Sequence, residues 1–547
     1  MKNRTFILAL ALFYFWCFIA IVAARGANPY IRDTHFAFIP WEVQTGYAGN
    51  VTRQVRRPST VMVYMNGSDL ESDHGAATND LLEMLNANVN PNNVNVILFT
   101  GGTKDWHNNA VPSNECVIWR IAGSTLEEVA NVGLLDMGNP GTLASFIEFS
   151  MDYYPADQYG LILWDHGGGS IVGFGSDEKF NKSSLSLADM DAAFKYAGLD
   201  THKLEFLGFD SCLMASVEMA VIASHYAHYL IASQDTEPAD GWDYNVLSIF
   251  NDMPHIGGEA FGIAVVDSFM DFYLGQEGHV LTLSVIKLSE VGPVMDVMGA
   301  LMKRCSSGLL LDASAFFPAF AEKRYNTKTF ALGSPRDADT DMVDIGDMAR
   351  QFSYLFPNES ADILDALSNT VLYNRHNSYV DICGLSTYYI YGGIGDAKMS
   401  LGTYHNLSMD EYYTQYLFDF ADILSGPQKN IKRPRVYSEE KPAVIMGHNV
   451  LLYEISQCYH GEVFFAVPAA VNGFEADVIV LVSEKHPNGK VLGYKKQEGI
   501  MKQKGYYNFV KGDKVTLYYF TDHWHSYDPF VVEELPVQVL VAGNFKW

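Results

Sequence analysis

Short apolar runs alternate with segments of helical periodicity from Arg57 onward. Runs rich in β-branched and aliphatic residues predict buried strands over 59–64, 94–99, 160–164 and 204–209. Apolar residues spaced three and four apart predict helices over 76–85, 142–154, 187–196 and 215–223. In the helix over 76–85, Leu81, Leu82 and Leu85 are expected on the inner side. Ser186 is expected to cap the helix over 187–196. This order of elements predicts an α/β fold with a mainly parallel sheet flanked by helices.

Two of the predicted strands end at residues with reactive side chains. The strand over 160–164 is followed by His166 and three glycines, and the strand over 204–209 is followed by Asp210, Ser211 and Cys212. The connection between them is long enough for a crossover helix, so the strands can be parallel neighbours. Reactive groups of such sheets gather beyond the carboxyl ends of the strands. We therefore expect His166 and Cys212 at the same edge of the sheet.

The amino terminus has the features of an export signal. Lys2 and Arg4 precede an uncharged apolar run over 6–24, which ends in small residues ahead of Arg25. The run is also just long enough to span a bilayer, so residues 1–25 are predicted to be either a cleaved signal peptide or a membrane anchor. In both cases the remainder is secreted or extracytoplasmic, and 26–57 is an N-terminal segment of the exported chain.

A change in composition marks a second domain near the carboxyl terminus. The segment 425–442 is polar, contains prolines and carries clustered lysines and arginines, so we interpret 429–442 as a linker. The runs 463–467, 477–482 and 514–520 are rich in β-branched and aromatic residues and are separated by turn residues. The sequence therefore predicts a smaller, antiparallel β-rich domain over 443–547.

The composition excludes several classes of protein. Lys and Arg number 37 against 64 Asp and Glu, a net charge of −27, which argues against nucleic acid and anionic lipid as partners. Six cysteines in 547 residues are too few for a disulfide scaffold. The absence from the sequence of Cys-x-x-Cys, His-Glu-x-x-His and Gly-Lys-Ser/Thr motifs removes support for a zinc site, a zincin or a P-loop NTPase.

Cys212 and His166 are the residues that can carry chemistry. A cysteine entering a helix would have its thiolate favoured by the helix dipole, and a neighbouring imidazole can accept the thiol proton and return it to a leaving amine. The three glycines after His166 let a peptide approach the backbone, so the N–H groups of Gly167 and Cys212 are candidate oxyanion donors. On spacing alone, a buried structural cysteine and a histidine in a turn are more common than a catalytic pair. Asp165 is expected to point away from the imidazole, since adjacent strand residues face opposite sides.

Several motifs together resemble the clostripain family of cysteine peptidases, whose wider clan includes gingipains, legumains and caspases. The resemblance covers roughly residues 58–425, and we take 58–428 as the peptidase domain. It is carried by Tyr159-Gly-Leu-Ile-Leu-Trp-Asp-His-Gly-Gly-Gly169, Leu207-Gly-Phe-Asp-Ser-Cys-Leu-Met214, Thr60-Val-Met-Val-Tyr-Met-Asn-Gly67 with Asp69-Leu70-Glu71, Met137-Gly-Asn-Pro-Gly-Thr-Leu143, Tyr154-Pro-Ala-Asp157, Glu237-Pro-Ala-Asp-Gly-Trp-Asp-Tyr244 and Gly384-Leu-Ser-Thr-Tyr-Tyr389.

The resemblance implies a caspase-like or gingipain-like fold and an acyl-enzyme route to peptide hydrolysis, with Cys212 as nucleophile and His166 as general acid/base. It also implies cleavage after arginine or lysine, because acidic side chains hold the basic residue in its pocket. Asp210 matches one pocket acid, and Asp240, or failing that Asp243, is expected to be the second. Asp210 is also typical of a helix cap, and Asp243 of a helix start.

Relatives of this family are often zymogens, so we expect self-cleavage in the polar loop 175–184, after Lys179 or Lys182, giving a monomer or a nicked two-chain form. No cofactor or metal site is required by the sequence, although some relatives need calcium. Polypeptides are the expected substrates. The alternative function is a non-catalytic surface binding protein, in which a peptidase-like fold carries an adhesive β domain.

Overall fold

The computed structural model describes residues 51–425, apart from 277, 332–339, 378–380 and 393–396, and eight strands between 453 and 531. The predicted export segment 1–25, most of the segment 26–57 and the linker 429–442 lie outside the described residues. None of the described helices is long and apolar enough to cross a membrane. The chain divides into two compact units, the first made of residues up to 294, 328–347 and 363–388, and the second of 295–327, 348–362 and the residues from 389 onward.

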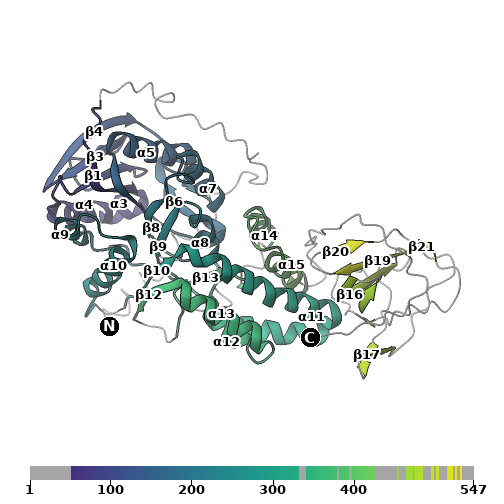
Figure 1. The fold of residues 1–547 in the computed structure, drawn as a ribbon. Helices are drawn as coiled ribbons and strands as arrows, with labels where there is room; N and C mark the ends of the chain where they lie inside the picture. Colours follow the sequence, from purple (N-terminus) through teal and green to yellow (C-terminus); the bar gives the residue numbers. More distant parts are fainter. Residues whose placement is uncertain are drawn as a thin grey trace, which may run out of the picture. The chain divides into compact units, whose positions relative to one another are not determined.

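A nine-stranded sheet is the centre of the first unit (Figure 1). Its order is β12-β10-β9-β8-β5-β1-β2-β3-β4, and the five middle strands, from β9 to β2, are parallel. The outer pairs are antiparallel. The strands are β1 (Arg57–Asn66), β2 (Val94–Gly101), β3 (Cys116–Ala122), β4 (Thr125–Gly133), β5 (Ala156–Trp164), β8 (Leu204–Asp210), β9 (Ala227–Ala232), β10 (Thr282–Lys287) and β12 (Val371–His376).

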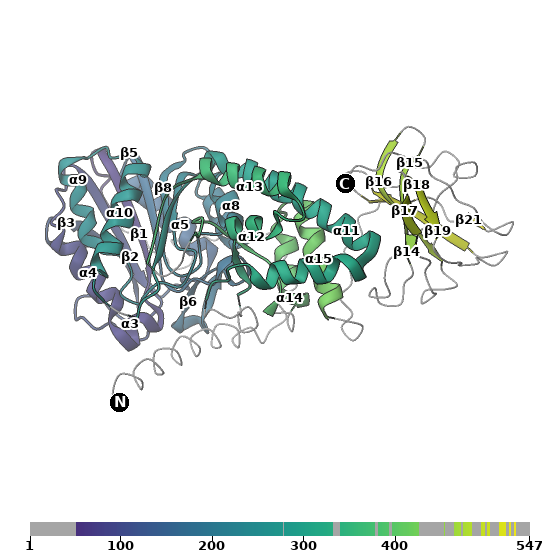
Figure 2. The same cartoon turned by 90° about the horizontal axis from the view of Figure 1, so that it is seen from below.

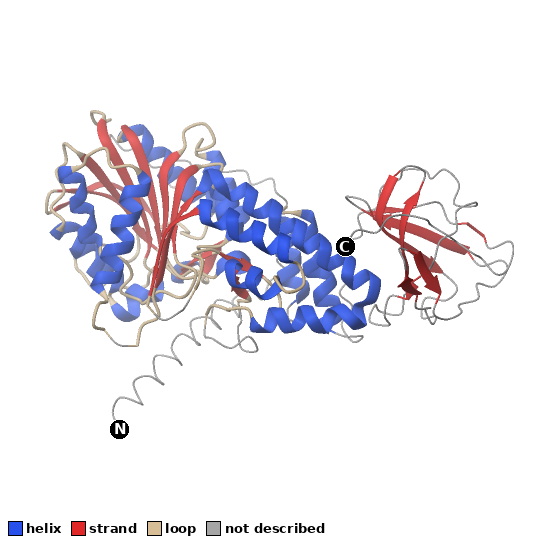
Figure 3. Cartoon of the chain, turned by 60° about the horizontal axis from the view of Figure 1, so that its bottom comes forward, coloured by secondary structure: helices blue, strands red, loops and turns tan. Residues whose placement is uncertain are grey.

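Helices cover both faces of this sheet, as Figures 2 and 3 show. One face carries α4 (Ala76–Asn86), α9 (Ile249–Asp252) and α10 (Gly258–Phe272), and the other carries α5 (Pro140–Tyr153), α7 (Leu187–Tyr196) and α8 (Val217–Ala223). A mainly parallel sheet between two helical layers confirms the predicted fold class. Each of the four predicted strands in this region is present, extended by one to four residues at one or both ends.

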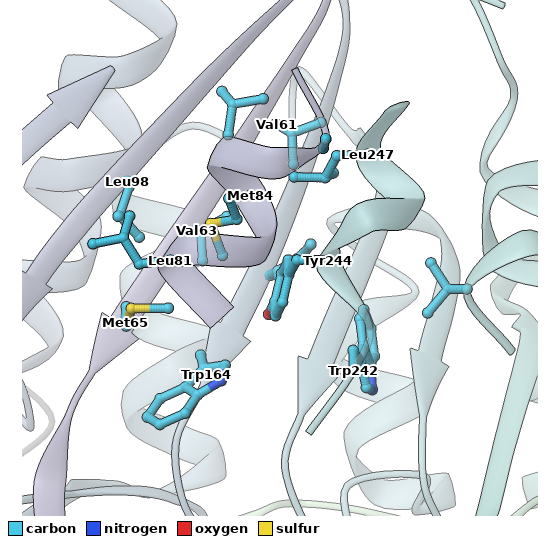
Figure 4. Packing of buried hydrophobic residues seen from close by; sticks show 14 of the residues in the cluster. Val61, Val63, Met65, Leu81, Met84, Leu98, Trp164, Trp242, Tyr244 and Leu247 are labelled. Atoms are coloured by element: carbon cyan, nitrogen blue, oxygen red, sulfur yellow. The ribbon is translucent and has the colours of Figure 1, made fainter. Parts of the chain in front are cut away.

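Successive side chains of β1 point to opposite faces of the sheet and pack into the apolar layer on each face. Val61, Val63 and Met65 pack beneath Leu81 and Met84 of α4 (Figure 4), and Tyr64 points to the opposite layer, where its ring lies 5.9 Å from that of Phe146. Neighbouring residues on a helix are separated by a large angle, so Leu82 is 53% exposed although Leu81 is buried, and Leu85 is half-buried. The expectation that Leu82 faces inward was therefore wrong.

Shorter elements lie at the carboxyl edge of the sheet. They are α3 (Ser68–His74), α6 (Gly169–Val172), the hairpin β6 (Phe174–Asp177) and β7 (Ser183–Leu185), and the two-stranded pair β11 (Met342–Asp344) and β13 (Ser386–Tyr388). Further helices are α11 (Val291–Asn326), α12 (Ile345–Phe352), α13 (Pro357–Thr370), α14 (Ala397–Asn406) and α15 (Glu411–Ser425). Short 3-10 turns span Glu178–Phe180, Tyr244–Ser248 and Leu288–Glu290.

The described strands near the carboxyl terminus pair antiparallel, as predicted. β15 (Phe464–Val471), β16 (Phe474–Ser483) and β19 (Lys514–Phe520) include nearly all of the predicted runs and are hydrogen-bonded in that order. β14 (Tyr453–Glu454), β20 (Trp524–Ser526) and β21 (Phe530–Val531) complete this sheet, and β17 (Tyr494–Gln497) pairs with β18 (Ile500–Gln503). The domain boundaries stay predictions.

The amino end of α7 is fixed by a reciprocal cap. The Ser186 hydroxyl accepts a hydrogen bond from the Asp189 N–H, and the Asp189 carboxylate accepts one from the Ser186 N–H. Both otherwise unpaired donors are satisfied at the position where the sequence predicts the helix to begin.

We expect the substitution Ser186→Ala to destabilise the protein by about 1 kcal/mol, because it removes one half of this cap. Thermal unfolding followed by circular dichroism should show a melting temperature lower by a few degrees. Ser186→Asp, which restores an acceptor, should recover most of the loss, and equal stability of the alanine variant and the wild type would contradict the assignment.

Candidate active site

The pairing of β5 with β8 brings His166 and Cys212 to the same edge of the sheet. The two strands are parallel, and Trp164 pairs with Asp210 in the last register position. His166 and Cys212 each follow two residues later, so both extend from adjacent strand ends by the same step. No hydrogen bond joins the Cys212 thiol to the imidazole among the described residues. This is common before substrate tightens a catalytic pair.

Cys212 lies in a turn, not at a helix terminus. The helix α8 begins only at Val217, and Ser216 caps it by accepting from the Met219 N–H. The expected support of a thiolate by the helix dipole is therefore wrong, since that effect fades within one turn. Instead, the backbone N–H of Glu237 donates to Cys212 Sγ at 3.2 Å. Burial of the thiol, together with the nearby charge of Glu237, raises its pKa to about 12.

The segment that follows β9 holds the turn in place. Leu213 N–H donates to the Asp235 carbonyl at 3.0 Å, and Ala215 N–H donates to the Ser233 carbonyl at 2.8 Å. Leu213 has a φ of 65°, a conformation that a bulky residue rarely adopts without such restraint. The nucleophile candidate is thus fixed by backbone hydrogen bonds from one segment, residues 233–237.

His166 has a carboxylate partner that the sequence did not reveal. Its Nε2 lies 2.7 Å from Oδ1 of Asp69 in α3, and both side chains are 15% exposed. The second Asp69 oxygen lies 3.5 Å from Nζ of Lys182. Burial lowers the pKa of His166, but the hydrogen bond to Asp69 and the charges of Asp165 and Asp69 outweigh it, so the pKa is raised. The pKa of Asp69 is lowered well below its usual range, because His166 and Lys182 outweigh its burial.

The Asp165 carboxylate is hydrogen-bonded to backbone N–H groups and not to the imidazole of His166. The carboxylate accepts from the backbone N–H groups of His166 and Ser176, each at 2.6 Å, and from the Asn66 side chain. This agrees with the expectation from strand alternation. Burial raises the pKa of Asp165 to about 7 despite these donors. Asp165 therefore fixes where the chain leaves β5.

The glycines after His166 make room for the backbone of Cys212. A Cβ atom on Gly167 would lie 1.9 Å from the Cys212 carbonyl oxygen, so no larger residue fits there. Neither the Gly167 N–H nor the Cys212 N–H donates a hydrogen bond to another described residue. Both predicted oxyanion donors are thus side by side and have no partner in the described part of the chain.

Asp210 occupies the predicted position of a pocket acid and lies among buried polar groups. Its carboxylate accepts from the Trp242 N–H at 3.2 Å and from the Tyr244 hydroxyl at 2.9 Å. Figure 4 shows both rings beside Trp164, whose indole N–H donates to Asp80 of α4. Burial raises the pKa of Asp210 to about 6 and that of Asp80 well above its usual value. The next helix, α8, begins only at Val217 and is capped by Ser216, and the Asp210 oxygens accept from the 242–244 segment, so Asp210 is not a helix cap.

The candidates for a second pocket acid lie in different surroundings. Asp240 is exposed, and its charge contributes to the raised pKa values of Asp80 and Glu83. Asp243 caps the turn at Tyr244–Ser248 and accepts from the Asn245 N–H and the Ser268 hydroxyl, so its oxygens are occupied. Glu237, which the sequence analysis did not single out, is buried next to Asp210.

The segment 175–184 is a short hairpin and not an exposed loop. Residues 175–177 are buried within β6, and Asn181 alone is fully exposed. Lys179 Nζ donates to the Lys104 carbonyl at 3.0 Å, whereas Lys182 contacts Asp69. Both Asn181 and Lys182 have positive φ values, 55° and 56°. Lys182 is therefore the one of the two lysines that contacts the partner of His166.

Among the described residues, no group of three or more His, Cys, Asp and Glu side chains could hold a metal ion. The calcium requirement implied by family resemblance therefore has no site to test in this part of the chain. It stays a prediction. The described cysteines Cys116, Cys212, Cys305 and Cys383 are free thiols.

Comparisons with known proteins show the family and the fold of this chain. The model of the clostripain family matches residues 63–468. A secreted C11 cysteine protease from Bacteroides thetaiotaomicron, "iotapain", is 17% identical with a TM-score of 0.50, covering 66% of this chain and 99% of its own. An inactive zymogen C11 protease from Parabacteroides distasonis is 19% identical with a TM-score of 0.47, covering 66% of this chain and 98% of its own. None of the curated proteins matches the sequence.

The match to a family of cysteine peptidases makes this chain a cysteine-type peptidase, a hydrolase that acts on polypeptides. The chain belongs to the clostripain family, whose model matches well over half of its length.

We expect Asp69→Asn to lower stability in a pH-dependent way. The pKa of His166 is raised in the folded state, so the ion pair contributes fully below the unfolded pKa of about 6.5 and is lost as pH rises through the folded value. The pKa of Asp69 is lowered, so its contribution is present at all pH values above about 4. The loss should be about 2 kcal/mol between pH 4.5 and 6.5 and smaller above pH 7.5.

Melting temperatures of Cys212→Ala and Cys212→Ala/Asp69→Asn across pH 4.5 to 9 measure this difference in a background that lacks the thiol. Asp73→Asn, which removes an exposed carboxylate of the same helix, is the control and should show little change. A difference that grows with pH would contradict the His166–Asp69 pairing.

Proposed function

We propose that the protein is an exported cysteine endopeptidase that cleaves after arginine or lysine by means of a Cys212–His166 dyad. The observation that carries the proposal is the register of β5 and β8, which gives the two residues equivalent positions at neighbouring strand ends. Family membership supports the reaction class, and the buried Asp210 supports the preference for a basic residue.

His166 acts as the base and then as the acid. Its Nε2 is bonded to Asp69, which leaves Nδ1 for the thiol proton. The thiol's pKa is raised to about 12, so the thiolate forms only as Sγ attacks the substrate carbonyl and Nδ1 takes the proton. The charge of Asp69 stabilises the imidazolium formed in that step. His166 then protonates the leaving amine, and a water molecule that it deprotonates hydrolyses the thioester.

The substrate carbonyl oxygen becomes negative during attack. The Gly167 and Cys212 N–H groups are the donors we assign to it, because they lie against each other and bond no other described residue. The basic side chain of the substrate enters beside Asp210, and exposed Asp240 adds attraction at the rim. A carboxylate in a dry pocket favours a guanidinium or ammonium over neutral side chains.

The protein is proposed to be a zymogen that cuts itself after Lys182. Contact of Lys182 with Asp69, the partner of His166, supports this lysine over Lys179, which is bound to the Lys104 carbonyl. The left-handed conformations of Asn181 and Lys182 store strain that cleavage would release. Export through the segment 6–24, with release or anchoring there, and a monomeric or nicked two-chain state complete the proposal.

Fluorogenic peptides that end in Arg, Lys, Asp or Asn test the activity. We expect cleavage of the Arg and Lys peptides only, and a loss of at least about 1,000-fold in kcat/KM for Cys212→Ala and for His166→Ala. Cys116→Ala, which removes another buried thiol, is the matched control and should stay active. Preference for the Asp or Asn peptide would overturn the proposed specificity, and activity in Cys212→Ala would overturn the nucleophile.

Self-cleavage is tested by expressing the wild type beside three variants. The wild type should give two fragments, the second beginning at Ser183, and Cys212→Ala should give one uncut chain. Lys182→Ala should abolish this cut, whereas Lys195→Ala, which changes an exposed lysine of α7, should not. Mass spectrometry of the fragments identifies the cleaved peptide bond. A wild-type chain that stays uncut would contradict self-activation.

A further inference from the structure

The carboxylate of Glu237 is buried and accepts no hydrogen bond from a described residue; the indole N–H of Trp242 interacts with it but is also without a hydrogen-bond partner. The residue is 5% exposed, and neither Oε1 nor Oε2 has a partner among the described residues. A carboxylate in such surroundings costs several kcal/mol of desolvation unless something compensates it. Buried polar atoms are nearly always satisfied in folded proteins, so this exception needs an explanation.

The backbone of Glu237 is tied to the nucleophile. Its N–H donates to Cys212 Sγ at 3.2 Å, and its carbonyl lies 3.8 Å from the same sulfur. Asp235, two residues earlier, holds the Leu213 N–H. The position of this acid relative to the reacting atom is therefore set by hydrogen bonds and not by a flexible side chain.

The carboxyl group of Glu237 faces that of Asp210. A hydrogen bond between these two groups requires a proton on one of them, because two ionised carboxylates have none to donate. Asp210 is itself held by the Trp242 N–H and the Tyr244 hydroxyl, so it cannot turn away. A Cβ on Gly241 would lie 2.6 Å from Asp210 Oδ1, and the backbone therefore closes over that carboxylate.

The titratable groups that surround Asp210 and Glu237 in the described part of the chain are acids, a thiol and phenols, and none of them is cationic. They are Asp80 and Glu83 of α4, Asp235 and Asp240 of the loop after β9, Cys212, Tyr244 and Tyr273. No lysine or arginine forms an ion pair with Asp210 or Glu237 in the described part of the chain. The positive charge that compensates this pair must therefore come from outside the described residues, as a proton from solvent or as a cation of a bound molecule.

We propose that Glu237 is a specificity-determining residue that pairs with Asp210: the two carboxyl groups share one proton while the pocket is empty and release it to solvent when the substrate's guanidinium or ammonium binds. This inference rests on the proposed cleavage after basic residues. Proton release exchanges one positive charge for another, so the pair together with its bound cation carries the same net charge as the proton-sharing pair did before binding.

The proposal gives KM a pH dependence that the dyad alone does not. At low pH the incoming cation must displace a tightly held proton, so 1/KM for an arginine substrate should rise by up to tenfold per pH unit over the acid range and then level off. A substrate with citrulline, the uncharged isostere of arginine, displaces no proton, and its KM should stay flat over the same range.

The experiment compares kcat and KM for matched Arg and citrulline peptides from pH 5 to 8.5 in the wild type, Glu237→Gln, Glu237→Asp and Glu259→Gln. Glu237→Gln should raise KM for the Arg peptide about 10- to 100-fold at pH 8, leave the citrulline peptide within about twofold, and remove the acid-range slope. Glu237→Asp should keep the slope. Glu259→Gln, which neutralises an exposed acid of α10, should behave as wild type.

The outcomes separate this inference from the proposed function. If the wild type does not prefer Arg to citrulline, the basic specificity itself fails. If it does, and Glu237→Gln keeps both the preference and the slope, or loses kcat equally for both peptides, Glu237 is only structural and the inference is overturned. Should Glu237→Gln not fold, loss of the slope in Glu237→Asp would overturn it equally.

Discussion

The parallel pairing of β5 with β8 is the constraint on which the site depends. Once Trp164 is opposite Asp210, the residues two steps beyond each strand end must emerge together at the carboxyl edge. A shift of one residue in either strand would point one side chain to the opposite layer. Gly160, where a Cβ would lie 2.1 Å from the Phe206 ring, helps to hold this register because the ring fills the space above the glycine. Catalytic geometry thus follows from sheet packing far below the surface.

The electrostatic character of the site is set by burial and not by a helix terminus. Without a dipole at Cys212, the thiol is held protonated, and His166 with its Asp69 partner carries the charge that the reaction needs. Such a resting state protects a partly exposed thiol from oxidation, since the thiolate is the reactive form. The protonated resting state also makes the reaction depend on substrate. Transfer of the thiol proton to His166 is productive only when a substrate carbonyl is bound for the sulfur to attack.

Local patterns predicted the fold and the placement of His166 and Cys212 at one edge of the sheet. Apolar strands, the Ser186 cap and residues at strand ends are signals of short range, and each was confirmed near its predicted position. Local patterns could not predict the hydrogen-bond partners of His166 and Cys212. Asp69 is 97 residues from His166, and Glu237 is 25 residues from Cys212. Their roles arise only when the sheet brings separate segments together. The helix start at Val217 was misplaced because Met214 and Ala215 continue the apolar pattern while their backbone is bound to the 233–237 segment.

In the proposed function, specificity and catalysis are joined in one segment. Residues 233–237 bind the turn that carries Cys212 through their backbone, and the same segment carries the Glu237 carboxyl group toward Asp210. A negative charge near sulfur raises the thiol's pKa and so opposes thiolate formation. Because the proposed exchange replaces a proton by the substrate's cation, it leaves the net charge beside the sulfur unchanged. Binding of the substrate therefore does not by itself create a thiolate, and the thiol stays protonated until its proton passes to His166 during attack.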